Sequence, residues 1–202
     1  MIQIFHSPNT RGVRPIWACE ELGLEYQVVP VDFSPEYRAT EEWRAMNPTG
    51  KVPVLRDGDV TMFESGAMVQ YLLDTYGNGR LAPAVSDSEY PIYLQWFWFS
   101  EATLSRPLGE VVNHGREFPG DKAIPEVLAE MRQRGVVCVE AVAAYMEGRT
   151  YLVNETFSAA DIMMGYGLLL CDMLIPGKMP DTLLPYWQSL QERPGFKRAI
   201  AA

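Results

Sequence analysis

The chain has 202 residues, of which 48% are hydrophobic and 21% are charged, and its formal net charge at pH 7 is −9. This length allows one large domain or two small ones with enough apolar side chains for a core, and the acidic balance argues against nucleic acid or an anionic membrane as a partner. No apolar run approaches the ~18–20 residues that span a membrane, and the chain begins on a strand pattern without a basic leader.

The cysteines and histidines favour a reducing compartment and argue against a metal site. Cys19, Cys138 and Cys171 lie far apart, are odd in number and form no Cys-x-x-Cys pair, which is typical of buried, reduced thiols in the cytoplasm. The two histidines, His6 and His114, belong to no cluster with ligand spacing. We therefore expect a cytoplasmic protein without a bound metal.

The first part of the chain alternates strand and helix patterns. A strand at residues 2–6, a helix from about 12 to 22 and a strand at 26–31 form a βαβ unit, and a short helix follows near 40–46. The hairpin and helix that come next complete a ββα unit.

Two strand-like runs, Val52–Arg56 and Val60–Phe63, flank an Asp-Gly-Asp turn signal. Pro53 stands at the entrance of the first run, where it donates nothing to a ladder and leaves the neighbouring backbone open to a ligand. Glu64 and Ser65 then open a helical pattern, and the amides of a helix N-terminus suit a carboxylate. The sequence therefore predicts an edge at which a small peptide docks.

Helical patterns dominate from residue 88 onward, after a segment rich in glycine, proline and serine. We expect a first domain over residues 1–78, a linker over 79–87 and a helical domain over 88–202. The predicted helices run from Glu89 to about Asn113, bent or broken near Pro107, and then over about 123–147, 159–174, 183–192 and 194–200.

Three segments resemble the glutathione transferase superfamily, and the resemblance extends over essentially the whole chain. They are residues 4–24 (IFHSPNTRGVRPIWACEELGL), the Asn47-Pro48-x-Gly50-Lys51-Val52-Pro53 run with its Glu64-Ser65 pair, and the capping box Phe157-Ser158-Ala159-Ala160-Asp161-Ile162. The pattern is nearest to the bacterial beta type. The resemblance implies a thioredoxin-like α/β N-terminal domain with a mixed four-stranded sheet, an all-α C-terminal domain, and a homodimer.

The same resemblance implies that glutathione is the co-substrate. The residues expected to hold it are Lys51, the backbone of Val52 beside a cis Pro53, Glu64 and Ser65. Glu64 and Ser65 have an alternative interpretation as first-turn residues favoured by the helix dipole, and Lys51 as a solvated surface cation. We interpret Ser158 and Asp161 as a structural cap.

Activation of the thiol is expected from the loop after the first strand. A free thiol has a pKa of about 8.5, and lowering it by about two units requires ~2.7 kcal/mol of thiolate stabilisation. This chain has Arg11 where beta-type members carry cysteine, and it lacks the tyrosine of other classes. The candidates, which are also plausible turn and cap residues, are Thr10, Asn9, Ser7 and Arg11.

Six aromatic residues between positions 90 and 99 exceed what one buried helix face needs. In the superfamily an apolar second substrate binds in the cleft between the domains. The resemblance therefore implies a role there for Tyr93, Phe97, Ser105, Arg106 and Tyr166.

The expected function is glutathione transfer to a small hydrophobic electrophile. Two alternatives remain open at this point. Glutathione could instead serve a peroxidase, reductase, isomerase or dehalogenase reaction in the same site, or the chain could be a non-catalytic binding or regulatory protein that retains the fold.

Overall fold

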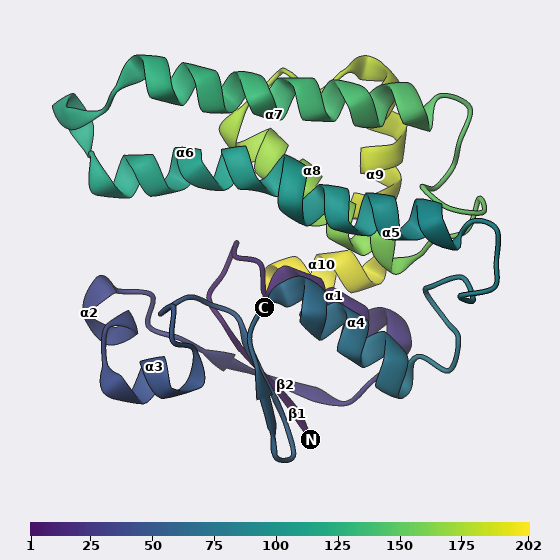
Figure 1. The fold of residues 1–202 in the computed structure, drawn as a ribbon, viewed down its shortest axis with the longest axis horizontal. Helices are drawn as coiled ribbons and strands as arrows, with labels where there is room; N and C mark the ends of the chain where they lie inside the picture. Colours follow the sequence, from purple (N-terminus) through teal and green to yellow (C-terminus); the bar gives the residue numbers. More distant parts are fainter. The chain divides into compact units, whose positions relative to one another are not determined.

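The computed structural model describes all residues from 1 to 202, which divide into two compact units (Figure 1). Unit 1 contains Met1–Leu81 together with Glu192–Ala202, and unit 2 contains Ala82–Gln191. The end of the chain thus lies in unit 1, whereas the sequence placed residues 88–202 in one helical domain. The reason is that the last helix packs its apolar face on the first one.

Unit 1 is built on a mixed four-stranded sheet with the strand order β2-β1-β3-β4. The β1 strand pairs in parallel with β2, whereas β3 is antiparallel to both β1 and β4. The strands are β1 Ile2–His6, β2 Tyr26–Pro30, β3 Val54–Asp57 and β4 Val60–Met62. This confirms the predicted thioredoxin-like α/β architecture.

The central strand β1 alternates between buried and half-buried residues, which places successive side chains on opposite faces of the sheet. Ile2, Ile4 and His6 are buried on one face. On the other face Phe5 meets Trp43, with the two ring centroids 6.3 Å apart. Helical residues therefore cover the sheet on both sides.

The helices of unit 1 include three that pack together, because α1 contacts both α4 and α10. Trp17 of α1 meets Phe196 of α10 edge to face, with ring centroids 4.9 Å apart. The helices are α1 Val13–Leu22, α2 Pro35–Arg38, α3 Glu41–Met46, α4 Ser65–Tyr76 and α10 Pro194–Ala201.

Unit 2 is entirely helical, with α5 against α8 and α6 against α7. Ser158 and Asp161 form the predicted capping box at the start of α8. The long helices are α5 Tyr90–Trp98, α6 Ser105–Glu117, α7 Pro125–Met146, α8 Ala159–Leu174 and α9 Leu184–Glu192, with short 3-10 turns at Gly120–Lys122 and Asp181–Leu183.

The expected long helix is interrupted earlier than predicted. A π-helical segment, Phe99–Leu104, separates α5 from α6, and this places Pro107 in the first turn of α6. The interruption therefore lies at residues 99–104 and not at Pro107.

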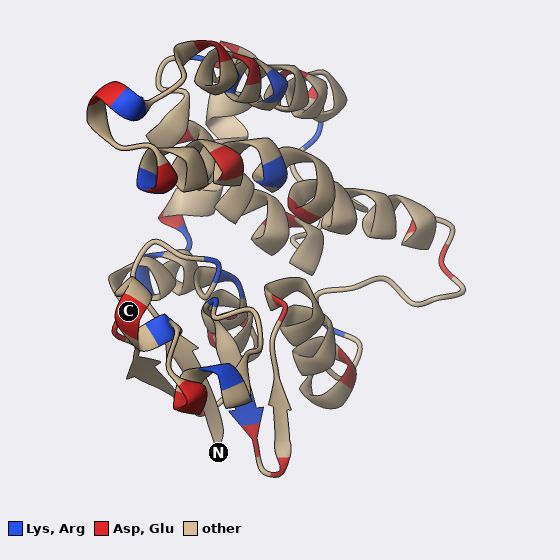
Figure 2. Cartoon of the chain, turned by 60° about the vertical axis from the view of Figure 1, so that its left-hand side comes forward, with Lys and Arg blue, Asp and Glu red and all other residues tan.

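None of the helices has both the length and the apolar character needed to cross a membrane. Figure 2 shows charged residues of both signs in the helices and loops of both units, and most of the ribbon carries neither sign.

Candidate functional site

The strand register brings the predicted site segments to one end of unit 1. Val54 pairs with Phe5, so the Val52-Pro53 segment lies beside the carboxyl end of β1, where the loop of residues 7–12 begins. The hairpin then leads into α4, which packs against α1. The thiol-activating candidates and the glutathione-holding candidates therefore meet at the same edge.

Thr10 is the best-organised member of the loop. Its Oγ1 donates to the carbonyl oxygen of Ser7 at 2.7 Å and lies 3.3 Å from Nδ1 of His6. The Thr10 amide also donates to the Ser7 carbonyl, at 3.3 Å. The Thr10 hydroxyl is half-buried, so it is held in place and still accessible.

The other loop candidates are less constrained. Asn9 is exposed and has a φ of 61°, in the left-handed region that asparagine tolerates better than most residues. Ser7 and Arg11 are half-buried. Gly12 caps α1 without a side chain, and the carbonyls of Thr10 and Arg11 accept the amides of the first α1 turn.

The predicted cis peptide bond between Val52 and Pro53 is confirmed. The β3 strand begins at Val54, so the backbone of Val52 lies outside the sheet ladders. The preceding loop is held by Asn47, which donates through Nδ2 to the carbonyl of Lys51 at 2.8 Å and accepts from Thr49 through Oδ1. The Lys51 side chain is exposed at the end of this ordered loop.

Glu64 and Ser65 stand at the start of α4. Glu64 has a φ of 78° and a ψ of 103°, an unusual conformation for a residue other than glycine. Strained backbone of this kind is concentrated at ligand-binding sites. The first amide bonded within the helix is that of Met68, so the amides of residues 65–67 have no helical partner and suit an anion.

A buried cation joins α1 to the start of α4. The guanidinium of Arg14, which is fully buried, donates through Nη1 to Oγ of Ser65 at 3.1 Å. The Ser65 hydroxyl accepts in this bond, so it keeps its own proton for a ligand oxygen.

Three residues at this end of unit 1 were not among the predicted site residues: His6, Arg14 and Asn47. The available signal for His6 was its position: it is a polar residue that follows Ile2 and Ile4 in the alternation of buried residues along the strand. Asn47 is 2% exposed and belongs to the motif quoted above. Only tertiary structure reveals the contact of Arg14.

The residues expected to contact a second substrate all lie in unit 2. Tyr93 and Phe97 are buried on α5, with ring centroids 5.7 Å apart. Ser105 begins α6 and is buried, whereas Arg106 is exposed. Tyr166 is buried on α8. Tyr93 and Phe97 therefore contact one another. The role of all five residues toward a ligand stays a prediction.

The three cysteines are free, buried and unsuited to thiol chemistry. Burial raises the pKa of Cys19 to about 12, and the charge of Glu20 adds to this effect. Burial also raises the pKa of Cys138, and it raises that of Cys171 to about 12. None of these thiols supplies a thiolate at neutral pH.

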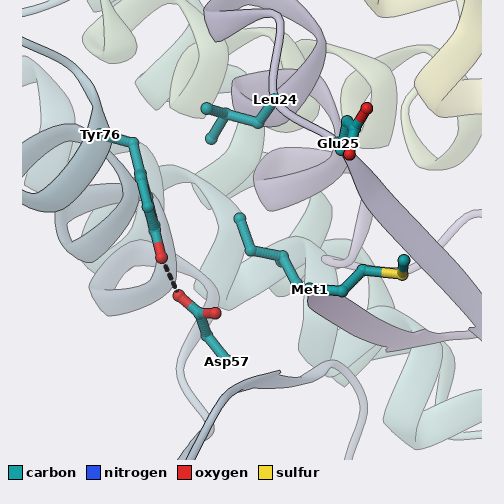
Figure 3. A pocket seen from close by; sticks show the side chains of 6 residues that line it. Met1, Leu24, Glu25, Asp57 and Tyr76 are labelled. Atoms are coloured by element: carbon teal, nitrogen blue, oxygen red, sulfur yellow. Dashed lines mark hydrogen bonds between the residues drawn. The ribbon is translucent and has the colours of Figure 1, made fainter.

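A separate pocket of about 350 Å³ lies at the opposite end of β1, as Figure 3 shows. Tyr76 donates its hydroxyl to the Asp57 carboxylate there, and Tyr71 does so at 3.0 Å. None of the predicted site residues lines this pocket, whose other walls come from Met1, Ile2, Leu24 and Glu25.

The fold and the docking edge define a class of two-part proteins in which a thioredoxin-like unit is joined to a helical one. Residues 2–74 match the family model of the glutathione S-transferase N-terminal domain. Glutathione S-transferase 4 of Zea mays is 30% identical over 196 residues, covering 92% of this chain and 85% of that protein. Glutathione S-transferase 1 of Triticum aestivum is 36% identical over 177 residues, covering 80% and 75%.

A solved structure shares the same fold. The glutathione transferase URE2P8 of Phanerochaete chrysosporium, solved with oxidized glutathione, has a TM-score of 0.85 at 24% identity, covering 98% of this chain and 92% of that one. With the two plant relatives, the family is established: the chain belongs to the glutathione S-transferases. The nearness to the bacterial beta type stays a prediction.

Proposed function

We propose that this protein is a glutathione transferase that binds glutathione at the edge formed by residues 7–12, 47–53 and the start of α4. The observation that carries the proposal is the convergence of these segments at the carboxyl end of β1. The Val52 backbone would pair with the peptide, and Lys51 would reach its glycine carboxylate. The partner-free amides of α4, with Glu64 and Ser65, would hold the γ-glutamyl end.

In this proposal Thr10 is the donor to the thiolate. A hydroxyl donor beside a helix N-terminus favours the charged form of a thiol and lowers its pKa. Thr10 is preferred to Asn9 because its oxygen is fixed by two neighbours, whereas Asn9 is exposed. Ser7 and Arg11 remain secondary candidates.

The activated thiolate would attack a small hydrophobic electrophile, a reaction that detoxifies it. Tyr93, Phe97, Ser105, Arg106 and Tyr166 are the residues we assign to that second substrate. Acceleration would come from thiolate stabilisation and proximity, without a covalent intermediate on the enzyme.

The proposal includes a homodimer in the cytoplasm. Both features are carried over from the family resemblance, and the three reduced cysteines are in keeping with a reducing compartment.

A calorimetric titration with glutathione, paired with ultraviolet absorbance of the thiolate in the same samples, tests this proposal. We expect saturable binding and a thiolate signal at neutral pH. The variant Glu64→Ala should weaken binding at least tenfold, which corresponds to about 1.4 kcal/mol. The matched control Glu42→Ala removes an exposed glutamate from the first turn of α3, also in unit 1, and should bind as the wild type does.

The two other outcomes have separate meanings. An absence of binding at millimolar glutathione would refute the glutathione site. Saturable binding without any thiolate signal would instead identify a non-catalytic glutathione-binding protein.

A further inference from the structure

His6 is a buried polar residue for which the proposed function has so far given no role. It ends β1 with 2% of its surface exposed, and its Nδ1 lies 3.3 Å from Oγ1 of Thr10. Its other ring nitrogen, Nε2, is buried and has no hydrogen-bond partner.

The position of one proton follows from counting donors. The Thr10 hydroxyl has a single proton, and at 2.7 Å it donates that proton to the carbonyl of Ser7. The contact with His6 then requires the proton to be on Nδ1. The opposite tautomer would leave an N–H at Nε2 buried without an acceptor, and this costs more than an unused lone pair.

We infer that His6 is a positioning residue, whose Nδ1–H donates to Thr10 Oγ1 and thereby directs the Thr10 hydroxyl proton to the glutathione thiolate. This inference rests on the proposed function. A hydroxyl that accepts one hydrogen bond becomes a better donor in the next, so the chain from His6 through Thr10 to sulfur is cooperative.

The switch to sulfur requires only rotation of the hydroxyl hydrogen about the Cβ–Oγ1 bond. Thr10 Oγ1 gives up its bond to the Ser7 carbonyl and keeps the bond that it accepts from His6. The Ser7 carbonyl keeps the amide hydrogen of Thr10, which already donates to it at 3.3 Å. No proton passes to the imidazole, and the thiol proton leaves to solvent.

The surroundings hold the His6 ring in this role. A side chain at position 12 would place its Cβ 2.1 Å from His6 Nδ1, although the φ of Gly12 is an ordinary −62°. Glycine is therefore required there for space and not for its conformation. Burial also lowers the pKa of His6 to about 4, so the ring is neutral at pH 7 and has one ring proton to donate.

The test is the pKa of the thiol of bound glutathione, measured by ultraviolet titration of the binary complex for a set of variants. His6→Leu and His6→Phe remove the donor, and we expect each to raise the thiol pKa by about 0.5–1 unit, a three- to tenfold loss of thiolate formation. In His6→Asn the amide nitrogen replaces Nδ1, and the wild-type value should return. Circular dichroism and urea unfolding establish which variants are folded, and either His6→Leu or His6→Phe suffices.

A double-variant cycle separates positioning from general stabilisation. If His6 acts through Thr10, adding His6→Leu to Thr10→Val should cause no further change in the thiol pKa. An equal shift with and without the Thr10 hydroxyl would overturn the inference, as would an unchanged thiol pKa in both single His6 variants.

Failure of the proposed function would look different. In that case wild-type protein itself would bind no glutathione, or would bind it with the thiol pKa of the free tripeptide. If glutathione binds with a lowered thiol pKa that Thr10→Val leaves unchanged, only the Thr10 assignment and the role of His6 are overturned.

Discussion

Arg14 Nη1 donates to Ser65 Oγ at 3.1 Å, and this bond fixes the start of α4 to the first turn of α1. The arrangement gives the Ser65 hydroxyl a direction. Its lone pairs face a buried guanidinium, so its proton is left for the carboxylate that we place at the helix N-terminus.

Ser65→Ala is therefore expected to have two effects. It should weaken glutathione binding at least tenfold, about 1.4 kcal/mol, and lower the free energy of unfolding by about 1.5–3 kcal/mol, because a hydrogen bond from a charged donor is lost. Calorimetry and urea unfolding measure the two effects separately. Glu64→Ala is the comparison, since the Glu64 side chain is exposed and should influence binding alone. Equal unfolding curves for Ser65→Ala and the wild type would contradict the structural half of this prediction.

Gly12→Ala should destabilise the protein by about 1–3 kcal/mol, because the new methyl group overlaps the His6 ring. The cause can be isolated in the background of His6→Ala, where the ring is gone and the same substitution should cost little. Chemical denaturation of the four proteins gives the coupling energy. A penalty of the same size in both backgrounds would mean that the clash with His6 is not its source.

The ion pair between Glu21 and Arg193 makes the attachment of α10 dependent on pH. Burial tends to raise the pKa of Glu21, but hydrogen bonds from Arg193, at 2.8 and 2.6 Å, and from Trp17, at 2.8 Å, outweigh it and hold the pKa below its ordinary value of 4.5. A carboxyl group whose pKa is lower in the folded protein stabilises the fold at pH values above its pKa in the unfolded chain. This contribution is lost as the pH falls through its pKa in the folded protein.

We therefore expect Glu21→Gln to be less stable than the wild type by about 1–2 kcal/mol at pH 7, in keeping with a charged hydrogen-bonded pair. The difference should shrink as the pH falls below about 4. Urea unfolding at a series of pH values measures it, with Glu25→Gln as the exposed control on the same unit. If the difference in stability between Glu21→Gln and the wild type stays constant down to the lowest pH tested, the charge of Glu21 is not its cause.

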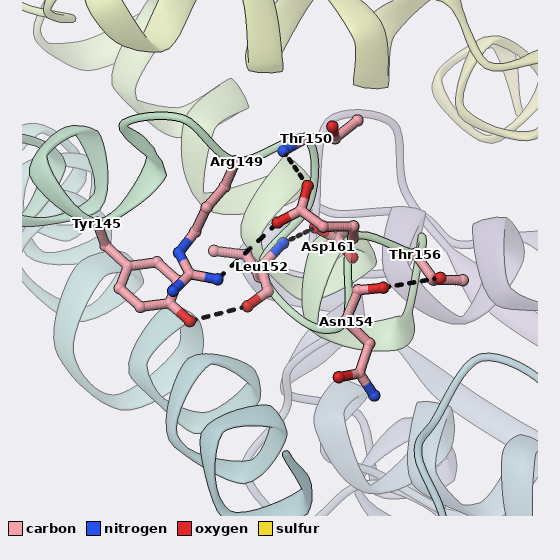
Figure 4. Close-up of polar contacts among 8 residues, drawn as sticks. Tyr145, Arg149, Thr150, Leu152, Asn154, Thr156 and Asp161 are labelled. Carbon is pink, nitrogen blue, oxygen red and sulfur yellow. Dashed lines mark hydrogen bonds and ion pairs between the residues drawn. The ribbon is translucent and has the colours of Figure 1, made fainter.

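Asp161 is the acceptor for four donors in unit 2, and Figure 4 shows the bond that its carboxylate accepts from the Leu152 amide. Oδ1 accepts from the Leu152 amide at 3.1 Å and the Tyr186 hydroxyl at 2.8 Å, while Oδ2 accepts from the amide and hydroxyl of Ser158 at 2.8 and 3.0 Å. In Asp161→Asn the new NH₂ group must face a backbone N–H in either orientation.

The expected cost of Asp161→Asn is about 2–4 kcal/mol, because at least one buried amide loses its acceptor. Thermal or urea unfolding measures this cost, and Asp121→Asn, at an exposed position, is the matched control. Stability within experimental error of the control would mean that the network tolerates an amide.

Much of the fold could be predicted because its signals are local. The capping box and the regular apolar spacing placed α8 at Ala159–Leu174 as observed, and the turn signal placed the hairpin of β3 and β4. The short helix Pro35–Arg38 was missed, because four residues are too few for a periodic pattern. The π-helical interruption at Phe99–Leu104 was also missed, since nothing in a continuous apolar helix pattern distinguishes it.

The candidate site could be predicted only in part, for a related reason. Val52, Pro53, Glu64 and Ser65 follow one another closely in the chain, so their motif is visible without coordinates. The contact of Arg14 with Ser65 spans 51 positions, and its cause is the packing of two helices. In the same way, the need for glycine at position 12 appears only once the His6 ring is placed.

The placement of α10 in unit 1 affects the order in which the units are completed during synthesis. Unit 2 is inserted between the two pieces of unit 1, so its residues leave the ribosome before Glu192–Ala202. Until then the Phe196 ring that packs against Trp17 of α1 is missing, although the strands of unit 1 have already been made. Domains usually fold in the order in which they are made, but here we expect unit 2 to be complete before unit 1, whose Trp17 lacks its Phe196 neighbour until α10 has emerged.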